Sequence, residues 1–156
     1  MSLYGIWDQD ERFLFAEGTL HRALSDLTVL FQDRRRPRIL LAGDFNIYRE
    51  WAASSVGGDW SPRYDTVFNR LEAYGLHFAG PAASEPLQNC PCGRGSECRH
   101  VRTFAFQRKA TNRPYQLDFV FATAGVEVVE CAVISDESDW TYSDHLPVGI
   151  TVRVSD

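Results

Sequence analysis

The stretch Arg38-Ile-Leu-Leu-Ala-Gly-Asp-Phe-Asn46 decides the fold that we predict for this chain. Its first half, residues 38–42, is a short continuous apolar run of the kind found in strands buried on both faces. After the glycine, Asp44 and Asn46 stand two residues apart and project to the same side, while Phe45 turns towards the core. A carboxylate beside a neutral amide suits a phosphate group, although an Asx-type turn that closes the strand would use the same residues.

The sequence on either side of this strand predicts an α+β fold. Apolar residues at helical spacing indicate a helix over residues 19–33 with Thr19 as its N-cap, and Pro62 suits the first turn of a helix over residues 62–74. A short helix is also expected within residues 47–55. Further strands are predicted at residues 3–7, 102–107, 116–123, 126–134 and 147–154. Helices between early strands, followed by a run of strands, predict a mixed sheet with helices on one face.

The composition indicates an ordinary globular chain. With 156 residues, 44% of them hydrophobic and 24% charged, we expect one domain over residues 1–156 with its own core. A Cys-rich irregular insert is expected at about residues 80–101, where Pro, Gly and Ser accumulate. No apolar run approaches the ~18 residues that span a bilayer, and the first residues lack signal-peptide features. We therefore expect a cytoplasmic protein with no membrane partner.

The charge excludes one class of nucleic-acid binder. A net charge of −5 is incompatible with a general polyanion-binding surface of the histone type. A nucleic-acid substrate is still compatible with this charge, because a site that binds Mg²⁺ must concentrate carboxylates.

A second motif, Gln116-Leu-Asp-Phe-Val-Phe121, places a carboxylate inside a hydrophobic strand. Alternation puts Leu117 and Phe119 on one face and Asp118 on the other. A charge in such a strand is costly unless it is paired, so Asp118 is a candidate functional residue. The alternative is an aspartate that faces solvent and has no function.

A third motif, Ser143-Asp-His-Leu-Pro-Val148, precedes the last predicted strand. Asp144 supplies a hard oxygen ligand, and His145 supplies a group that titrates near neutrality. In isolation this tripeptide carries little information. Its meaning comes from its position after the other two motifs.

Together and in this order, the three motifs resemble the endonuclease/exonuclease/phosphatase family, the DNase I-like hydrolases. Thr103-Phe104 also looks like the Thr-aromatic pair that precedes the Asp118 strand in that family. The resemblance runs from about residue 2 to residue 154, apart from the Cys-rich insert. It implies a DNase I-like mixed β-sheet with helices on one face, which is the carboxy-terminal half of a four-layer α/β sandwich.

The resemblance also implies roles for individual residues. Asp44 would orient or deprotonate the attacking water, and Asn46 would contact phosphate oxygens or the metal. His145 would hydrogen-bond the phosphoryl group while Asp118 holds its imidazole. Asp144 would help to bind Mg²⁺ or Mn²⁺. The implied catalytic set is therefore Asp44, Asn46, Asp118 and His145, and the implied metal set is Asp44, Asn46, Asp144 and His145.

The function implied is Mg²⁺-dependent hydrolysis of phosphodiesters, with DNA or RNA as the favoured substrate. A phosphatase of lipid or small-molecule phosphoesters is one alternative, and a catalytically silent half-domain that acts as an interaction module is another. The family's amino-terminal half supplies an Asn and a Glu ligand that we do not find in these 156 residues. We therefore expect that half, or a second copy of the chain, as a partner, with weak Mg²⁺ binding and little diesterase activity in the chain alone.

The insert carries its own candidate metal site. Cys90, Cys92, Cys98 and His100 offer three thiols and an imidazole within eleven residues, a ligand set that tetrahedral Zn²⁺ takes in structural sites. Their spacing does not match a standard zinc finger. A disulfide and free thiols are the alternatives.

Overall fold

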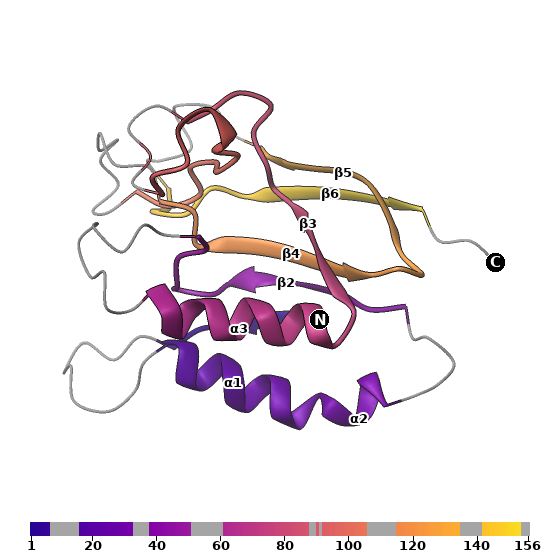
Figure 1. The fold of residues 1–156 in the computed structure, drawn as a ribbon. Helices are drawn as coiled ribbons and strands as arrows, with labels where there is room; N and C mark the ends of the chain where they lie inside the picture. Colours follow the sequence, from indigo (N-terminus) through magenta and orange to yellow (C-terminus); the bar gives the residue numbers. More distant parts are fainter. Residues whose placement is uncertain are drawn as a thin grey trace.

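The computed structural model describes residues 1–6, 16–32, 38–50, 61–87, 90, 92–105, 115–134 and 142–153. These residues form an α+β structure whose helices and strands are shown in Figure 1. None of the helices in the described part of the chain is both long and apolar enough to cross a membrane.

A mixed sheet forms the centre of the fold, as the sequence predicts, and it has four strands. Its strands are β1 (Ser2–Tyr4), β2 (Leu40–Asp44), β4 (Asp118–Thr123) and β3 (Leu76–Gly80), in the order β1-β2-β4-β3. β1 runs parallel to β2, whereas β4 is antiparallel to both of its neighbours. The closing residues of β2 therefore lie beside the first residues of β4.

The helices lie together on one side of this sheet (Figure 1). They are α1 (Ala16–Asp26), the short α2 (Thr28–Phe31) and α3 (Ser61–Ala73). Between them and the sheet is an aromatic core in which the rings of Phe45, Phe68, Phe119 and Phe121 contact one another. Phe119 and Phe121 face the helices, so alternation along β4 turns Asp118 to the opposite side of the sheet.

The last two strands do not join the central sheet, contrary to the single sheet that we expected. β5 (Glu127–Val133) and β6 (Val148–Arg153) form a separate antiparallel pair. This pair lies on the side of the sheet away from the helices, where β5 contacts β3 and β4 (Figure 1). Val120 and Ala122 on that side of β4 are only 1% and 6% exposed, so the sheet is covered there. The expected relation to half of a four-layer sandwich stays a prediction.

The first helix begins earlier than predicted, at Ala16, so Thr19 is not its N-cap. The Thr19 hydroxyl instead donates to the Ala16 carbonyl at 2.8 Å and accepts the Ile6 amide at 3.0 Å, which ties the helix to the segment after β1. The predicted helix is also divided after Asp26, and residue 33 lies outside the described residues.

Three local predictions also need correction. Residues 47–50 of the expected short helix are irregular, with Glu50 at a φ of 56°, and its remaining residues lie outside the described ones. Within the expected strand 102–107, Phe104 makes isolated bridges, while residues 106–107 are not described. β3 was not predicted, although Gly75 ends α3 and an alternating run follows it. The insert therefore begins at the end of a strand and contains one described 3-10 turn, Gly95–Glu97.

Thr103 joins β4 to the segment that precedes β6. Its fully buried hydroxyl accepts the backbone amides of Leu117 at 3.0 Å and Asp118 at 3.2 Å. Its own amide donates to the Tyr115 carbonyl, and its carbonyl accepts the Leu146 amide, both at 2.9 Å. One small side chain and its backbone thus fix the entry to β4 and the position of the residue after His145.

We predict that Thr103→Val destabilises the protein by about 1–3 kcal/mol, because two buried amides lose their acceptor while the side-chain shape is kept. Thr103→Ser retains the hydroxyl and should cost much less. Chemical denaturation of the two variants measures the difference. Equal stabilities would show that the hydroxyl is not the group that holds β4.

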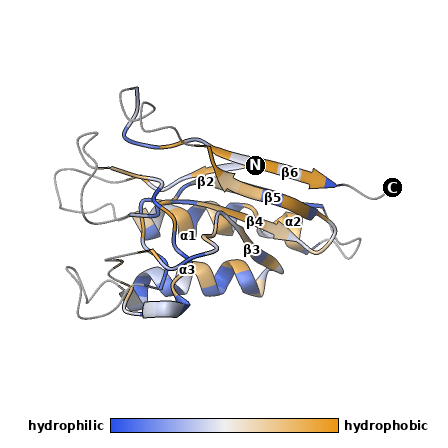
Figure 2. Ribbon diagram, turned by 90° about the horizontal axis from the view of Figure 1, so that it is seen from above, coloured by the Kyte–Doolittle hydropathy of each residue, from blue (hydrophilic) through white to orange (hydrophobic). Residues whose placement is uncertain are grey.

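The β5–β6 pair exposes apolar side chains to solvent. Val129, Ile134 and Val152 are 51%, 60% and 40% exposed, and hydrophobic colours continue along these strands in Figure 2. Burying one Val or Ile side chain fully stabilises an association by about 1.5–3 kcal/mol. This pair is therefore the surface through which we expect self-association.

We predict that the chain self-associates at high concentration and that Val129→Lys with Ile134→Lys weakens this association. Val29→Lys is the matched control, because Val29 is 70% exposed but lies on α2. Light scattering across a concentration series measures the effect. A wild-type chain that stays monomeric throughout would contradict the prediction.

Candidate functional site

Asp118 and His145 form the centre of the candidate site. Asp118 is the first residue of β4, and His145 belongs to the turn before β6. The ring Nδ1 of His145 lies 2.8 Å from Asp118 Oδ2, so Nδ1 donates to the carboxylate. The Phe104 ring packs against the imidazole with a centroid distance of 4.9 Å. The hydrogen bond and the ring contact together fix the orientation of His145.

Asp44 completes the cluster from the end of β2. It is the register partner of Asp118 across the antiparallel pair, so the two carboxylates start from directly opposite backbone positions. The second ring nitrogen, His145 Nε2, lies 3.6 Å from Asp44 Oδ2. That distance is too long for a direct hydrogen bond, so both atoms can contact a third group. The side chains of Asp44, Asp118 and His145 are 16%, 18% and 26% exposed and can therefore be reached from solvent.

Asn46 holds Asp44 in place. Its backbone amide donates to Asp44 Oδ1 at 2.9 Å, which is the Asx-type turn considered above, and its side-chain Nδ2 donates to Asp44 Oδ2 at 3.0 Å. The same Nδ2 also donates to the Gly5 carbonyl at 2.8 Å. Asn46 adopts a φ of 51°, a conformation that asparagine tolerates better than most residues. In this structure Asn46 therefore positions the carboxylate of Asp44.

Two glycines allow the chain to close around this turn. A Cβ at Gly43, whose φ is 155°, would lie 1.8 Å from the Leu3 carbonyl oxygen. A Cβ at Gly5 would lie 2.0 Å from the carbonyl oxygen of Phe45. The importance of Gly5 was missed from the sequence. Its only signal is its position directly after a short strand, which many glycines share.

The surroundings of Asp44 and His145 raise the pKa values of both side chains. Burial raises the pKa of the Asp44 carboxyl to about 6, although the charge of His145 and hydrogen bonds from Asn46 act in the opposite direction. Burial lowers the pKa of His145, but Asp118, Asp44 and Asp144 outweigh it and hold that pKa above the ordinary 6.5. The site therefore combines a carboxylate base, Asp44, with an imidazole whose protonated form the surrounding carboxylates favour.

The structure brings most of the expected residues together. Ligand atoms of Asp44, Asp118 and His145 all lie within 4.8 Å of one another, as a metal site requires. Asn46 contacts Asp44 directly, as described above. Asp144 is adjacent in the chain and its charge reaches His145, but its exposed carboxylate is not part of that group. Its place in the metal set stays a prediction.

The four expected ligands of the insert also converge. One ligand atom from each of Cys90, Cys92, Cys98 and His100 lies within 4.8 Å of the others. All four cysteines of the chain are free, so no disulfide joins them. Burial raises the pKa of Cys90 to about 12. At Cys98, backbone hydrogen bonds outweigh burial and hold the pKa below its ordinary value.

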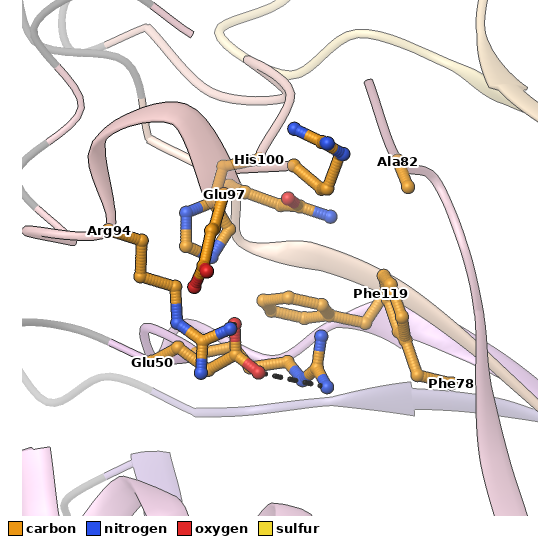
Figure 3. A pocket seen from close by; sticks show the side chains of 10 residues that line it. Glu50, Phe78, Ala82, Arg94, Glu97, His100 and Phe119 are labelled. Atoms are coloured by element: carbon orange, nitrogen blue, oxygen red, sulfur yellow. Dashed lines mark ion pairs between the residues drawn. The ribbon is translucent and has the colours of Figure 1, made fainter. Parts of the chain in front are cut away.

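A cavity of about 310 Å³ opens beside the insert (Figure 3). Its charged and titratable lining residues are Arg49, Glu50, Arg94, Glu97, Arg99 and His100. Glu50 lies 3.2 Å from the Arg49 guanidinium and 3.3 Å from that of Arg94. Neither Asp44, Asp118 nor His145 lines this cavity. Several of its charges neutralise one another, so we place the chemistry at the Asp–His cluster instead.

Two exposed aromatic side chains, Tyr4 and Tyr142, are 64% and 83% exposed and are close to cluster residues in register or in sequence. Tyr4 is the register partner of Asp44, and Tyr142 comes two residues before Asp144. The exposure of Tyr4 shows that its ring contributes little to the core.

Comparisons with models of known protein families and with curated proteins give no match for this chain.

Proposed function

We propose that this chain carries the catalytic centre of a metal-dependent phosphoesterase that cleaves phosphodiesters in nucleic acid. The observation that carries the proposal is the arrangement of His145, which is hydrogen-bonded through Nδ1 to Asp118 while Nε2 faces Asp44 at 3.6 Å. A carboxylate–imidazole pair next to a second carboxylate supplies a donor and a base within reach of one substrate atom.

The residues of the chain have distinct parts in this reaction. Asp44 accepts a proton from the attacking water, whose oxygen forms a bond to phosphorus as the bond from phosphorus to the leaving oxygen breaks. His145 donates from Nε2 to a non-bridging phosphoryl oxygen, where negative charge is concentrated. Asp118 accepts from Nδ1–H and stabilises the imidazolium, the form of His145 in which Nε2 can donate to the substrate. The leaving oxygen takes its proton from solvent.

The donor set fits Mg²⁺ or Mn²⁺. These cations prefer oxygen ligands, and Asp44, Asn46 and Asp144 offer two carboxylates and an amide oxygen at the strand ends, next to His145. A bound cation supplies charge neutralisation at the phosphoryl group. Asp44 and Asp118 also start from opposite backbone positions, an arrangement that a positive charge stabilises.

The exposed tyrosines Tyr4 and Tyr142 support nucleic acid as the substrate class. Exposed aromatic rings provide stacking surfaces for unpaired bases, worth about 1–3 kcal/mol per base. Tyr4, the register partner of Asp44, and Tyr142, two residues before Asp144, present such exposed rings. A lipid or small phosphoester would gain less from these rings, so the Tyr4→Ala and Tyr142→Ala variants distinguish the substrate classes.

We predict that His145→Ala and Asp118→Asn each reduce metal-dependent diester cleavage by about 10²–10⁴-fold, because they remove or misorient the donor. His77→Ala and Asp26→Asn are matched controls at exposed positions, where His77 pairs with Glu72. Hydrolysis of bis(p-nitrophenyl) phosphate and of a labelled oligonucleotide, with Mn²⁺, measures the effect. Oligonucleotide binding with Mn²⁺ provides a second readout if turnover is slow.

The interaction-module alternative gives a different result. If neither turnover nor oligonucleotide binding depends on Mn²⁺, and His145→Ala behaves like His77→Ala, the proposed function is wrong. Metal-dependent binding that requires Asp44 but shows no turnover at all would support a silent module.

We also predict that Mn²⁺ affinity rises with pH through about 6. Below that pH a proton occupies Asp44, whose pKa is about 6, and competes with the cation. Loss of the proton from His145 at higher pH removes a positive charge and acts in the same direction. Titration calorimetry at pH 5, 6, 7 and 8 tests this, with Asp44→Asn expected to bind weakly at every pH. A flat wild-type profile would contradict it.

A further inference from the structure

We propose that Cys90, Cys92, Cys98 and His100 form a structural Zn²⁺ site that fastens the insert to the turn after β2. The site is separate from the proposed phosphoesterase centre and does not depend on it. Three independent observations support the proposal: the convergence of four ligand atoms, the hydrogen bonds around them, and the position of the cluster.

The distances match tetrahedral coordination. His100 Nδ1 lies 3.3 Å from Cys90 Sγ and 3.7 Å from Cys98 Sγ. With Zn–S near 2.3 Å and Zn–N near 2.0–2.1 Å, tetrahedral geometry places a nitrogen and a sulfur about 3.6 Å apart. All four ligand atoms also lie within 4.8 Å of one another. The side chains are thus already spaced for one small ion.

The hydrogen bonds around the cluster are those that metal ligands need. Besides its contacts through Nδ1 with the Cys90 and Cys98 sulfur atoms, the His100 imidazole interacts with the backbone of Arg49, and both residues line the same cavity. A backbone partner of this kind helps to hold the ring of a metal-binding histidine in place. The sulfur of Cys98 accepts backbone hydrogen bonds from His100 and Leu87, and that of Cys90 accepts one from Cys92. Such donors stabilise thiolates.

Burial and ligand type favour zinc over the alternatives. Cys92 and Cys98 are 5% and 1% exposed, and His100 is 8% exposed, so the cluster is shielded like a closed structural site. A disulfide would use only two of the three thiols and would not explain why the third thiol and the imidazole also converge. All four cysteines are free, so no disulfide is formed. Thiolates bind soft or borderline metals in preference to hard ones, so this set of ligands does not suit Mg²⁺.

The position of the cluster shows what the ion would join. Through His100 it reaches Arg49, three residues after Asn46. At the other end of the insert, Gln116 accepts the Val101 amide at 3.1 Å and donates to the Pro81 carbonyl at 2.9 Å. His100 also lines the cavity of Figure 3, where it points towards the same space as Phe119. The zinc would therefore hold the insert against the turn that follows the Asp44–Asn46 segment.

The experiment measures zinc in the chain purified without chelator. Elemental analysis should give about one zinc per chain in the wild type, and this should fall at least about fivefold in Cys98→Ser and His100→Ala. Cys131→Ser is the matched control, since Cys131 lies in β5 outside the cluster and its loss should leave the zinc in place. Asp44→Asn should also retain zinc, which separates this site from the phosphoesterase centre.

Two measurements on the wild type keep the test decisive if the variants do not fold. A mercurial that blocks thiols should release the zinc in proportion to the thiols modified, and replacement by Co²⁺ should give the visible absorption of tetrahedral thiolate coordination. A folded, zinc-free wild type that does not take up Zn²⁺ or Co²⁺ would overturn the proposal, as would zinc that is lost in Asp44→Asn but kept in Cys98→Ser.

Discussion

Asp44 and Asp118 face each other across the β2–β4 register, and like charges in opposite positions of a sheet destabilise it. The rest of the site can be understood as the response to this constraint. His145 lies between the two carboxylates, with Nδ1 on Asp118 and Nε2 towards Asp44, and its pKa is held above the ordinary value. Thr103 fixes both β4 and the residue after His145, so the imidazole is kept where the charge requires it.

This arrangement is poorly explained by stability alone. Two apolar residues at the same register position would pack without any of these partners, whereas the carboxylates are held by the His145 imidazole and by the Asx-type turn at Asn46. Perturbed titrating groups that are accessible to solvent and grouped at strand ends are more common at functional sites than elsewhere. The local conflict between Asp44 and Asp118 is therefore part of the argument for function, because a divalent cation would relieve it.

The residues of the candidate site could be predicted from the sequence better than the division of the strands between the central sheet and the separate β5–β6 pair. Asp44 ends β2, Asp118 begins β4 and His145 lies in the turn before β6, each beside a strand with a strong local pattern. Whether β5 and β6 join the central sheet depends on pairings between distant residues, which no local pattern encodes. β3 was missed because its run of five residues is short and alternates only weakly between apolar and polar side chains. The role of Gly5 depends on a backbone approach that only the structure reveals.

The two candidate metal sites differ in the hardness of their ligands, and this difference keeps their chemistry apart. Carboxylate and amide oxygens at Asp44 and Asn46 suit a cation that exchanges ligands readily, as a reacting phosphate requires. Thiolates at Cys90 and Cys98, shielded by burial and backbone donors, suit an ion that stays in place. His100 and Arg49 line the same cavity, so the proposed zinc site lies beside the chain just beyond the proposed Mg²⁺ site. A rigid site is thus positioned to hold the geometry of an adjacent site at which ions and substrates come and go.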